Sequence, residues 1–295
     1  MAKILAVGIA TLDIINTVKR YPPMDSETRA LSQHKTRGGN ATNTLAVLSQ
    51  LGHQCYWAGV LIDETDTQLI RKDLASYNIN ISACQKAVNG KMPTSYITLD
   101  QQTGSRTIVH FRDCPEYSFA SFKALDLAAY DWIHFEGRNI TETRLMLQYL
   151  KQHHPSIPCS LEIEKSRSQI ASLFHLPTVL LFSEDYVRKQ DNKTPADFLQ
   201  TLKKPHDTIA TCTWGSHGAW LIDNSGTVHN AMPSSYSGTI DTLAAGDTFN
   251  AGLIHALCIK KPQHQALDYA NQLANHKCHQ SGLAGLTLSF NYQEQ

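Results

Sequence analysis

The segment DWIHFEGRNITETRLMLQYLKQHHPSIPCSLEIEKSRSQIASLFHLPTVLLF (residues 131–182) decides the fold class of this chain. Short apolar runs at 131–137, 158–164 and 178–184 alternate with stretches of helical periodicity at 140–154 and 168–175. Strands that alternate with helices pair in parallel, because each helix returns the chain across the sheet. The segment therefore predicts a parallel sheet with helices on both faces.

The same alternation extends in both directions from this segment. The apolar run at 3–10 is interrupted by Asp13 and lacks a convincing cleavage site, so we interpret it as a first core strand and not as a secretory leader. We expect a further strand at 55–62 and another at 208–215, and helices at 38–52, 64–78, 195–204, 245–261 and 262–282. Together these elements predict a three-layer α/β/α fold with a mostly parallel central sheet.

Two extended segments, at about 14–36 and 92–112, do not follow this rhythm. The first contains polar extended pieces at 14–22 and 27–35, and the second places the turn sequence QQTG between strands at 95–100 and 105–111. Together they predict a small separate sheet that covers one end of the main body. Because no long linker or repeat is visible, we expect residues 1–295 to form one domain with this sheet as its lid.

Composition and charge exclude several classes of protein. The chain has 295 residues with 26 Lys and Arg against 26 Asp and Glu, so nothing favours binding to nucleic acid or to an anionic membrane surface. No run of about 18 apolar residues is present to span a bilayer. Seven scattered cysteines without a CxxC pair indicate reduced thiols in a cytoplasmic protein, and not a zinc site or a disulfide framework.

Common catalytic motifs are missing, but the segment DTLAAGD (residues 241–247) has the features of an anion site. The sequence lacks GxxxxGK[ST], GxGxxG, HExxH and GxSxG. In the segment, Ala244, Ala245 and Gly246 lead into a helix, whose first backbone N–H groups can bind a phosphate. Asp247 can accept a proton from a substrate hydroxyl. It can equally be an ordinary first-turn acid, and the segment alone leaves both interpretations open.

A second polar group lies at RGGNATN (residues 37–43), again at the start of an expected helix. Gly39 allows close backbone approach, and Asn40 and Asn43 lie three residues apart on one helical face. Asp13 follows the first strand and can accept hydrogen bonds from hydroxyl groups. Carboxylates and amides at the strand ends of an open α/β sheet favour a polyol pocket, although a glycine turn with solvated asparagines would give the same pattern.

Taken together, these motifs resemble the ribokinase-like (PfkB) carbohydrate kinases, and within them the ketohexokinases, which are fructokinases acting at carbon 1. The resemblance covers residues 3–285 and rests on YPPMDSETRALSQ (21–33), RGGNATN (37–43), TGSRTI (103–108), DWIHFEGRN (131–139), LEIEKSR (161–167) and DTLAAGDTFNA (241–251). It implies a ribokinase-like fold, ATP and Mg²⁺ as cofactors with K⁺ as a candidate activator, and a homodimer clasped through the lid.

The resemblance also implies a role for each matching residue. Asp247 matches the general base that takes the proton of the sugar hydroxyl, and the matched anion hole comprises Ala244, Ala245 and Gly246. The matched sugar-binding positions are Asp13, Gly39, Asn40 and Asn43, joined by Asp25, which resembles a lid acid that reaches the sugar of the neighbouring subunit. The matched nucleotide positions are Arg106, which reaches the phosphates, and Gly215, Ser216, His217 and Gly218.

Three departures from the family pattern accompany the resemblance. Residue 244 is Ala where most relatives have Gly, which strains the backbone only if this position needs a positive φ. The Asn-x-x-Glu that organises Mg²⁺ in many relatives is replaced by SEDY at 183–186, which leaves Glu162 and Glu164 as candidate contributors. Ser216 and His217 stand where the most similar relatives carry acidic residues.

From the resemblance we expect ATP-dependent phosphorylation of a ketose, with fructose converted to fructose 1-phosphate. The alternatives are a kinase of the same scaffold for another acceptor, such as the fructose 6-position, ribose, tagatose or a nucleoside. A sensor that binds sugar without turnover is a further alternative, but it has no need of a base at position 247.

Overall fold

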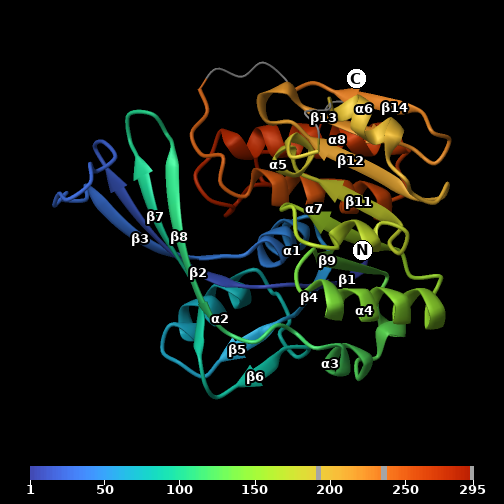
Figure 1. Cartoon of the computed structure of the whole chain (residues 1–295), viewed down its shortest axis with the longest axis horizontal. Helices are drawn as coiled ribbons and strands as arrows, with labels where there is room; N and C mark the ends of the chain where they lie inside the picture. Colours follow the sequence, from blue (N-terminus) through green and yellow to red (C-terminus); the bar gives the residue numbers. More distant parts are fainter. Residues whose placement is uncertain (191–193, 234–237, 293–295) are drawn as a thin grey trace.

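The computed structural model describes residues 1–190, 194–233 and 238–292, and it consists of a central sheet between two helical layers with a small sheet at one side (Figure 1). The central sheet has eight strands in the order β14-β13-β12-β11-β10-β9-β1-β4. In that order they span Val228–Ala231, Ala219–Ile222, Ile209–Thr213, Val179–Phe182, Cys159–Ile163, Trp132–Glu136, Lys3–Val7 and Gln54–Ala58.

The central sheet is mostly parallel, as the sequence predicts. Strands β4, β1, β9, β10, β11 and β12 pair in parallel, whereas β13 and β14 add antiparallel strands at one edge. The parallel strands are nearly continuous apolar runs because helices cover both of their faces. Ile4 and Leu5 on β1 and Leu161 on β10 are fully buried.

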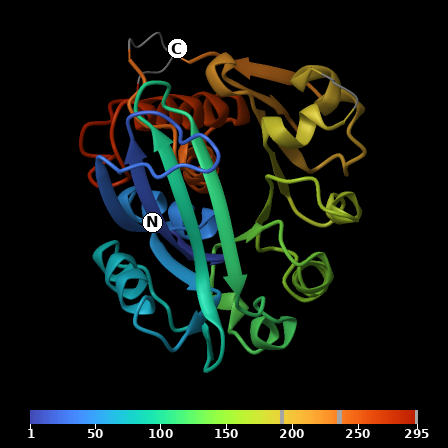
Figure 2. The same ribbon diagram turned by 60° about the vertical axis from the view of Figure 1, so that its left-hand side comes forward.

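The helices form one layer on each face of the central sheet (Figures 1 and 2). On one face α1, α7 and α8 pack against one another, and the other layer contains α3 to α6. The α-helices are α1 (Asn40–Gln50), α2 (Thr67–Ser76), α3 (Phe119–Lys123), α4 (Ile140–His153), α5 (Glu184–Arg188), α6 (Pro195–Thr201), α7 (Ala245–Cys258) and α8 (Gln263–Cys278). Within the described ranges, none of them has the length and apolar character needed to cross a bilayer.

A separate four-stranded sheet, here called the lid sheet, projects from one side of the main body (Figure 1) and lies across the front of the molecule in Figure 2. Its order is β3-β2-β7-β8, with strands at Ser32–Gly38, Thr11–Val18, Lys91–Asp100 and Arg106–Asp113. Both predicted insertions therefore contribute to it. The sheet reaches beyond the predicted bounds, since β2 begins at Thr11 and β3 continues to Gly38.

Three local predictions are wrong. The helix expected at 168–175 is a single 3-10 turn, η2 (Ile170–Leu173). The strand expected at 55–62 is divided at Gly59 into β4 and β5 (Val60–Ile62), and β5 pairs with β6 (Gln85–Ala87) in a two-stranded sheet. A Cβ at Gly59 would come within 2.2 Å of the Trp57 ring, so only glycine fits between the two strands. The extended piece expected at 27–35 forms a strand only from Ser32.

The cysteines are all free thiols, as expected from their spacing. Burial raises the pKa of Cys55, Cys159 and Cys212 to about 12, so these three remain protonated at neutral pH. They act as small apolar side chains of the core.

Candidate active site

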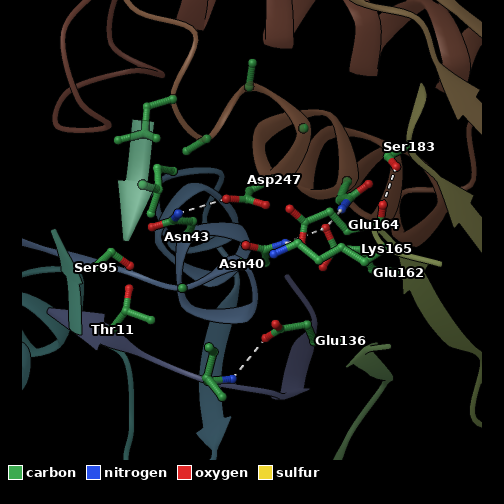
Figure 3. Close-up of a pocket in the computed structure, with 18 of the residues that line it drawn as sticks. Thr11, Asn40, Asn43, Ser95, Glu136, Glu162, Glu164, Lys165, Ser183 and Asp247 are labelled. Carbon is green, nitrogen blue, oxygen red and sulfur yellow. Dashed lines mark hydrogen bonds and ion pairs between the residues drawn. The ribbon is translucent and has the colours of Figure 1, made fainter. Parts of the chain in front are cut away.

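A cavity of about 490 Å³ lies between the carboxyl ends of the central strands and the inner face of the lid sheet, and it is here called the sugar cavity after the ligand that the sequence resemblance implies. Figure 3 shows side chains from α1, α7, the lid sheet and the ends of β9 and β10 pointing into it. The structure brings together nine of the residues selected from the sequence, namely Asp13, Gly39, Asn40, Asn43, Arg106, Ala244, Ala245, Gly246 and Asp247.

The start of α1 is fixed by a glycine and by a buried arginine. Gly39 has φ +103°, and a Cβ there would lie 2.3 Å from the carbonyl oxygen of Ile9, so only glycine fits. The Arg37 guanidinium forms an ion pair with Asp73 and donates from Nη1 to Oδ1 of Asn43 at 2.7 Å. Since Oδ1 of Asn43 is occupied in this way, its amide nitrogen faces the cavity as a donor.

Asp247 lies in the first turn of α7 and faces the start of α1. The Asn43 amide donates to Oδ2 of Asp247 at 2.8 Å (Figure 3). Burial raises the pKa of Asp247 to about 7, and the charges of Glu164 and Glu136 add to the effect against the hydrogen bond from Asn43. A carboxyl group with a pKa near neutrality can exchange a proton at physiological pH, as a general base must.

The backbone at the start of α7, where the sequence predicts an anion site, begins in a left-handed conformation. Ala244 has φ +61°, so this position does require the left-handed conformation that its alanine adopts at a cost. The Ala245 N–H already donates to the carbonyl of Thr242 at 3.3 Å, so fewer than the four expected N–H groups are available. Gly246 has open space on its Cα, which leaves its N–H accessible.

Lys277, at the end of α8, holds the loop before α7 in place. Lys277 is fully buried and donates from Nζ to Oδ2 and to the carbonyl oxygen of Asp241, at 2.7 and 2.9 Å. Burial opposes ionisation of Asp241, but hydrogen bonds from Lys277 and from the Leu243 and Gly282 N–H groups outweigh it and lower the pKa of Asp241. On the side of the lid sheet, Arg106 of β8 donates to Thr242 Oγ1 at 3.1 Å. The loop is thus fixed on both sides.

A second cavity of about 620 Å³ adjoins the first and is here called the nucleotide cavity after the ligand that the sequence resemblance implies. Gly215, Ser216 and Gly218 line it, whereas His217 is not among its lining residues. The two cavities share the lining residues Arg106, Thr213, Thr242, Ala245 and Gly246. The predicted anion site at the start of α7 therefore lies at the junction of the two cavities.

Acidic side chains at the ends of β9 and β10 complete the sugar cavity. Glu162 accepts hydrogen bonds at Oε1 from Asn40 and Asn250, at 3.1 and 3.2 Å, while its Oε2 is buried without a partner among the described residues. Burial raises the pKa of Glu162 well above its ordinary value, and the charges of Asp247 and Glu136 add to this. Glu136 escaped the sequence analysis, although the run HFEG places it at the end of a buried strand, where ligands bind in open sheets.

The two remaining sequence interpretations concern a metal and the lid. Among residues 1–190, 194–233 and 238–292, no group of three or more His, Cys, Asp or Glu side chains is arranged to hold a metal ion. The side chains of His276 and His279, at the end of α8, hydrogen bond to Ser289 and to the Asn275 carbonyl. Asp25 lies on an exposed loop between β2 and β3 and does not line the sugar cavity of its own chain.

Comparison with known proteins agrees with this geometry. The sequence matches the pfkB family carbohydrate kinase domain over residues 1–288. The chain belongs to the pfkB family. It is 34% identical to ketohexokinase of Mus musculus over 293 residues, which cover 96% of this chain and 98% of the mouse enzyme.

Other family members share the fold at lower identity. The ribokinase structure from Giardia lamblia superposes with a TM-score of 0.85 at 14% identity, covering 97% of each chain. The Arabidopsis thaliana ribokinase complexed with ribose and ATP gives a TM-score of 0.79 at 17% identity, covering 98% of this chain and 99% of the plant chain. The chain is thus an ATP-dependent carbohydrate kinase with a ribokinase-like fold.

We predict that Ala244→Gly increases the stability of the protein. A left-handed alanine costs about 1–2 kcal/mol, whereas glycine loses about 0.5–1 kcal/mol more backbone entropy on folding. The free energy of unfolding in urea should therefore rise by up to about 1 kcal/mol. The matched variant Ala245→Gly, one residue later in ordinary helical backbone, should instead lose up to about 1 kcal/mol. Destabilisation by both substitutions would show that Ala244 is unstrained.

Proposed function

We propose that this kinase transfers the γ-phosphate of ATP to a ketose, with fructose converted to fructose 1-phosphate. The observation that carries the proposal is the position of Asp247, a buried carboxyl group with a raised pKa that lines the sugar cavity directly after Ala245 and Gly246, which line both cavities. The choice of a ketose is supported by the 34% identity to ketohexokinase, against 22% for the ribokinase of Bacillus subtilis.

The chemistry follows from the two cavities and their junction. Asp247 removes the proton from the sugar hydroxyl as its oxygen attacks the γ-phosphorus. A new O–P bond forms, the bond between the γ-phosphorus and the β,γ-bridging oxygen breaks, and ADP leaves with the electron pair. The proton remains on the Asp247 carboxyl group until solvent takes it. Burial favours this step, because the protonated carboxyl is the form that the site stabilises.

Hydrogen-bond donors at the junction of the two cavities face the negative charge that develops on the transferred phosphoryl group. The Gly246 N–H and the positive end of α7 face it from one side, and the Arg106 guanidinium, which can bind phosphate oxygens in pairs, faces it from the lid. Such preorganised donors stabilise the transition state in a way that solvent cannot. A chain with zero net charge can therefore bind a polyanionic nucleotide through this local arrangement.

Among the described residues the acidic side chains of the sugar cavity do not form a metal site by themselves, but they can add ligands to a divalent cation that phosphate oxygens and water hold. Glu162 offers a buried Oε2 without a partner among the described residues, and Glu164 and Glu136 line the same cavity with oxygen ligands of the kind that Mg²⁺ prefers. Mg²⁺ usually retains several waters and binds phosphate oxygens directly, so it does not require a cage of protein ligands. When bound, the ion supplies charge neutralisation between the β- and γ-phosphates. We propose K⁺ only as an activator to be tested.

Sugar hydroxyls would be held by the polar groups at the start of α1 and on β2. Asp13 is buried and accepts from Thr11 Oγ1 at 2.7 Å, and burial raises its pKa while these hydrogen bonds oppose the shift. Asn40 offers its amide oxygen as an acceptor, because its amide nitrogen already donates to Glu162 and Glu164, and Asn43 donates from an amide that Arg37 holds in place. The backbone of Gly39 lines the floor of the cavity without a side chain to obstruct it.

The substrate is tested with a panel of fructose, tagatose, ribose and adenosine, each with MgATP and an ADP-coupled readout. We expect the highest kcat/KM with fructose, and NMR of the product should place the phosphate on carbon 1. Phosphate on carbon 6, or a higher kcat/KM for ribose or adenosine, would refute the proposed substrate. Thermal stabilisation by sugar without ADP release would instead indicate a sensor.

The role of Asp247 is tested by Asp247→Asn and by the pH dependence of the wild type. Loss of the base should lower kcat by at least ~10²-fold, the low end of general-base contributions. Because only the ionised carboxylate accepts the proton, kcat/KM of the wild type should fall about tenfold per pH unit below about 7. A near-normal kcat in the variant, or a profile flat down to pH 5, would reject Asp247 as the base.

We also propose a homodimer through the lid sheets, in which Asp25 reaches the sugar of the partner subunit. The outer face of β7 and β8 exposes Tyr96, Val109 and Phe111, and β8 is an edge strand that a second copy can cover. Val109→Asp should therefore convert the dimer to a monomer in gel filtration and raise the KM for sugar. A wild type that elutes as a monomer, or a variant that remains dimeric, would contradict this arrangement.

A further inference from the structure

The inner face of the lid sheet carries a transverse row of polar side chains. Asp13 on β2 is paired with Ser95 on β7, and Ser95 is paired with His110 on β8. Residues directly opposite on neighbouring strands point to the same face. All three line the sugar cavity, as Asp247 does.

Hydrogen bonds along the row determine the tautomer of the His110 imidazole. Ser95 Oγ lies 3.2 Å from His110 Nδ1, and the Ser95 hydroxyl is also a hydrogen-bonding partner of the Asp13 carboxylate. An ionised carboxylate can only accept, so the serine donates its single proton to Asp13. The serine oxygen must then accept the proton of His110 Nδ1. In this tautomer Nε2 carries the lone pair and is an acceptor.

We propose that His110 is a specificity-determining residue whose Nε2 accepts a hydrogen bond from a sugar hydroxyl other than the one that is phosphorylated. The inference rests on the proposed function, because it assumes that the sugar occupies the cavity in front of this row. Asp13 and His110 then offer two acceptors at opposite ends of the row, with Ser95 between them. Ile97 and Ile108, the next pair along β7 and β8, add an apolar wall beside His110.

The charges around His110 favour the neutral imidazole that this contact needs. Burial lowers the pKa of His110, and the positive charges of Arg138, Lys165 and Arg112 lower it further, against the opposing effect of Asp13. The imidazole is therefore neutral at pH 7, and it gains a proton only at a pH below the ordinary pKa of histidine. Protonation converts Nε2 from an acceptor to a donor, so the KM for sugar should rise as the pH falls.

The test compares wild type, His110→Phe and His110→Gln with the best sugar of the panel. Phenylalanine removes the acceptor, and we expect KM to rise about 3- to 10-fold with kcat changed less than about twofold. Glutamine places an amide oxygen near the position of Nε2, so it should recover most of the affinity but no longer titrate. The exposed His206→Phe, far from the cavity, controls for the substitution type and should match the wild type.

A pH series from 5.5 to 8 separates this role from that of Asp247. The ratio of the KM of wild type to that of His110→Gln should increase toward low pH, because the contribution of Asp247 is common to both proteins. A KM in His110→Phe equal to that of wild type, or a ratio independent of pH, would overturn the inference. If fructose is not turned over, the proposed substrate fails, and the same comparison on the best acceptor still decides the role of His110.

Discussion

The hydrogen bond from Asn43 to Asp247 joins the two halves of the site, and the remaining geometry depends on it. These residues lie 204 positions apart and stand in the first turns of α1 and α7. The buried Arg37 guanidinium holds the Asn43 amide in the one orientation that lets it donate to Asp247. Because both helices begin at the carboxyl edge of the central sheet, their starts face a common cavity. The proposed sugar-binding side and the proposed phosphate-binding side are thereby held in a fixed relation.

The place where α1 meets α7 also gathers negatively charged groups in a buried environment, and burying them is energetically unfavourable. Asp247, Glu162 and Glu136 are all buried and all have raised pKa values, chiefly because burial disfavours their ionised forms. A structure that served only stability would not gather carboxyl groups in this way. Substrate hydroxyls and a divalent cation are the groups that would relieve the cost, so the electrostatics of this site are consistent with its proposed chemistry.

The layers of the fold and the starts of α1 and α7 could be predicted from the sequence, because apolar periodicity and glycine-rich turns are local signals. The predictions were wrong where the local structure depends on packing. The periodicity at 168–175 predicts a helix, yet only a 3-10 turn forms, and Gly59 divides an apolar run that reads as a single strand. Glu136 was also missed as a site residue, since a lone acid at a strand end is meaningful only once its neighbours are known. The strain at Ala244 remained open until the backbone showed a positive φ.

The most direct test of the account is the pKa of the Asp247 carboxyl group, followed by ¹³C NMR in protein labelled at aspartate side chains and assigned by its absence in Asp247→Asn. If burial between the two helix starts sets its proton affinity, the resonance should titrate with a midpoint near 7. Asn43→Ala removes the hydrogen bond that stabilises the ionised form, so it should move the midpoint higher still. A midpoint near 4, the range of a solvent-exposed aspartate, would contradict the account.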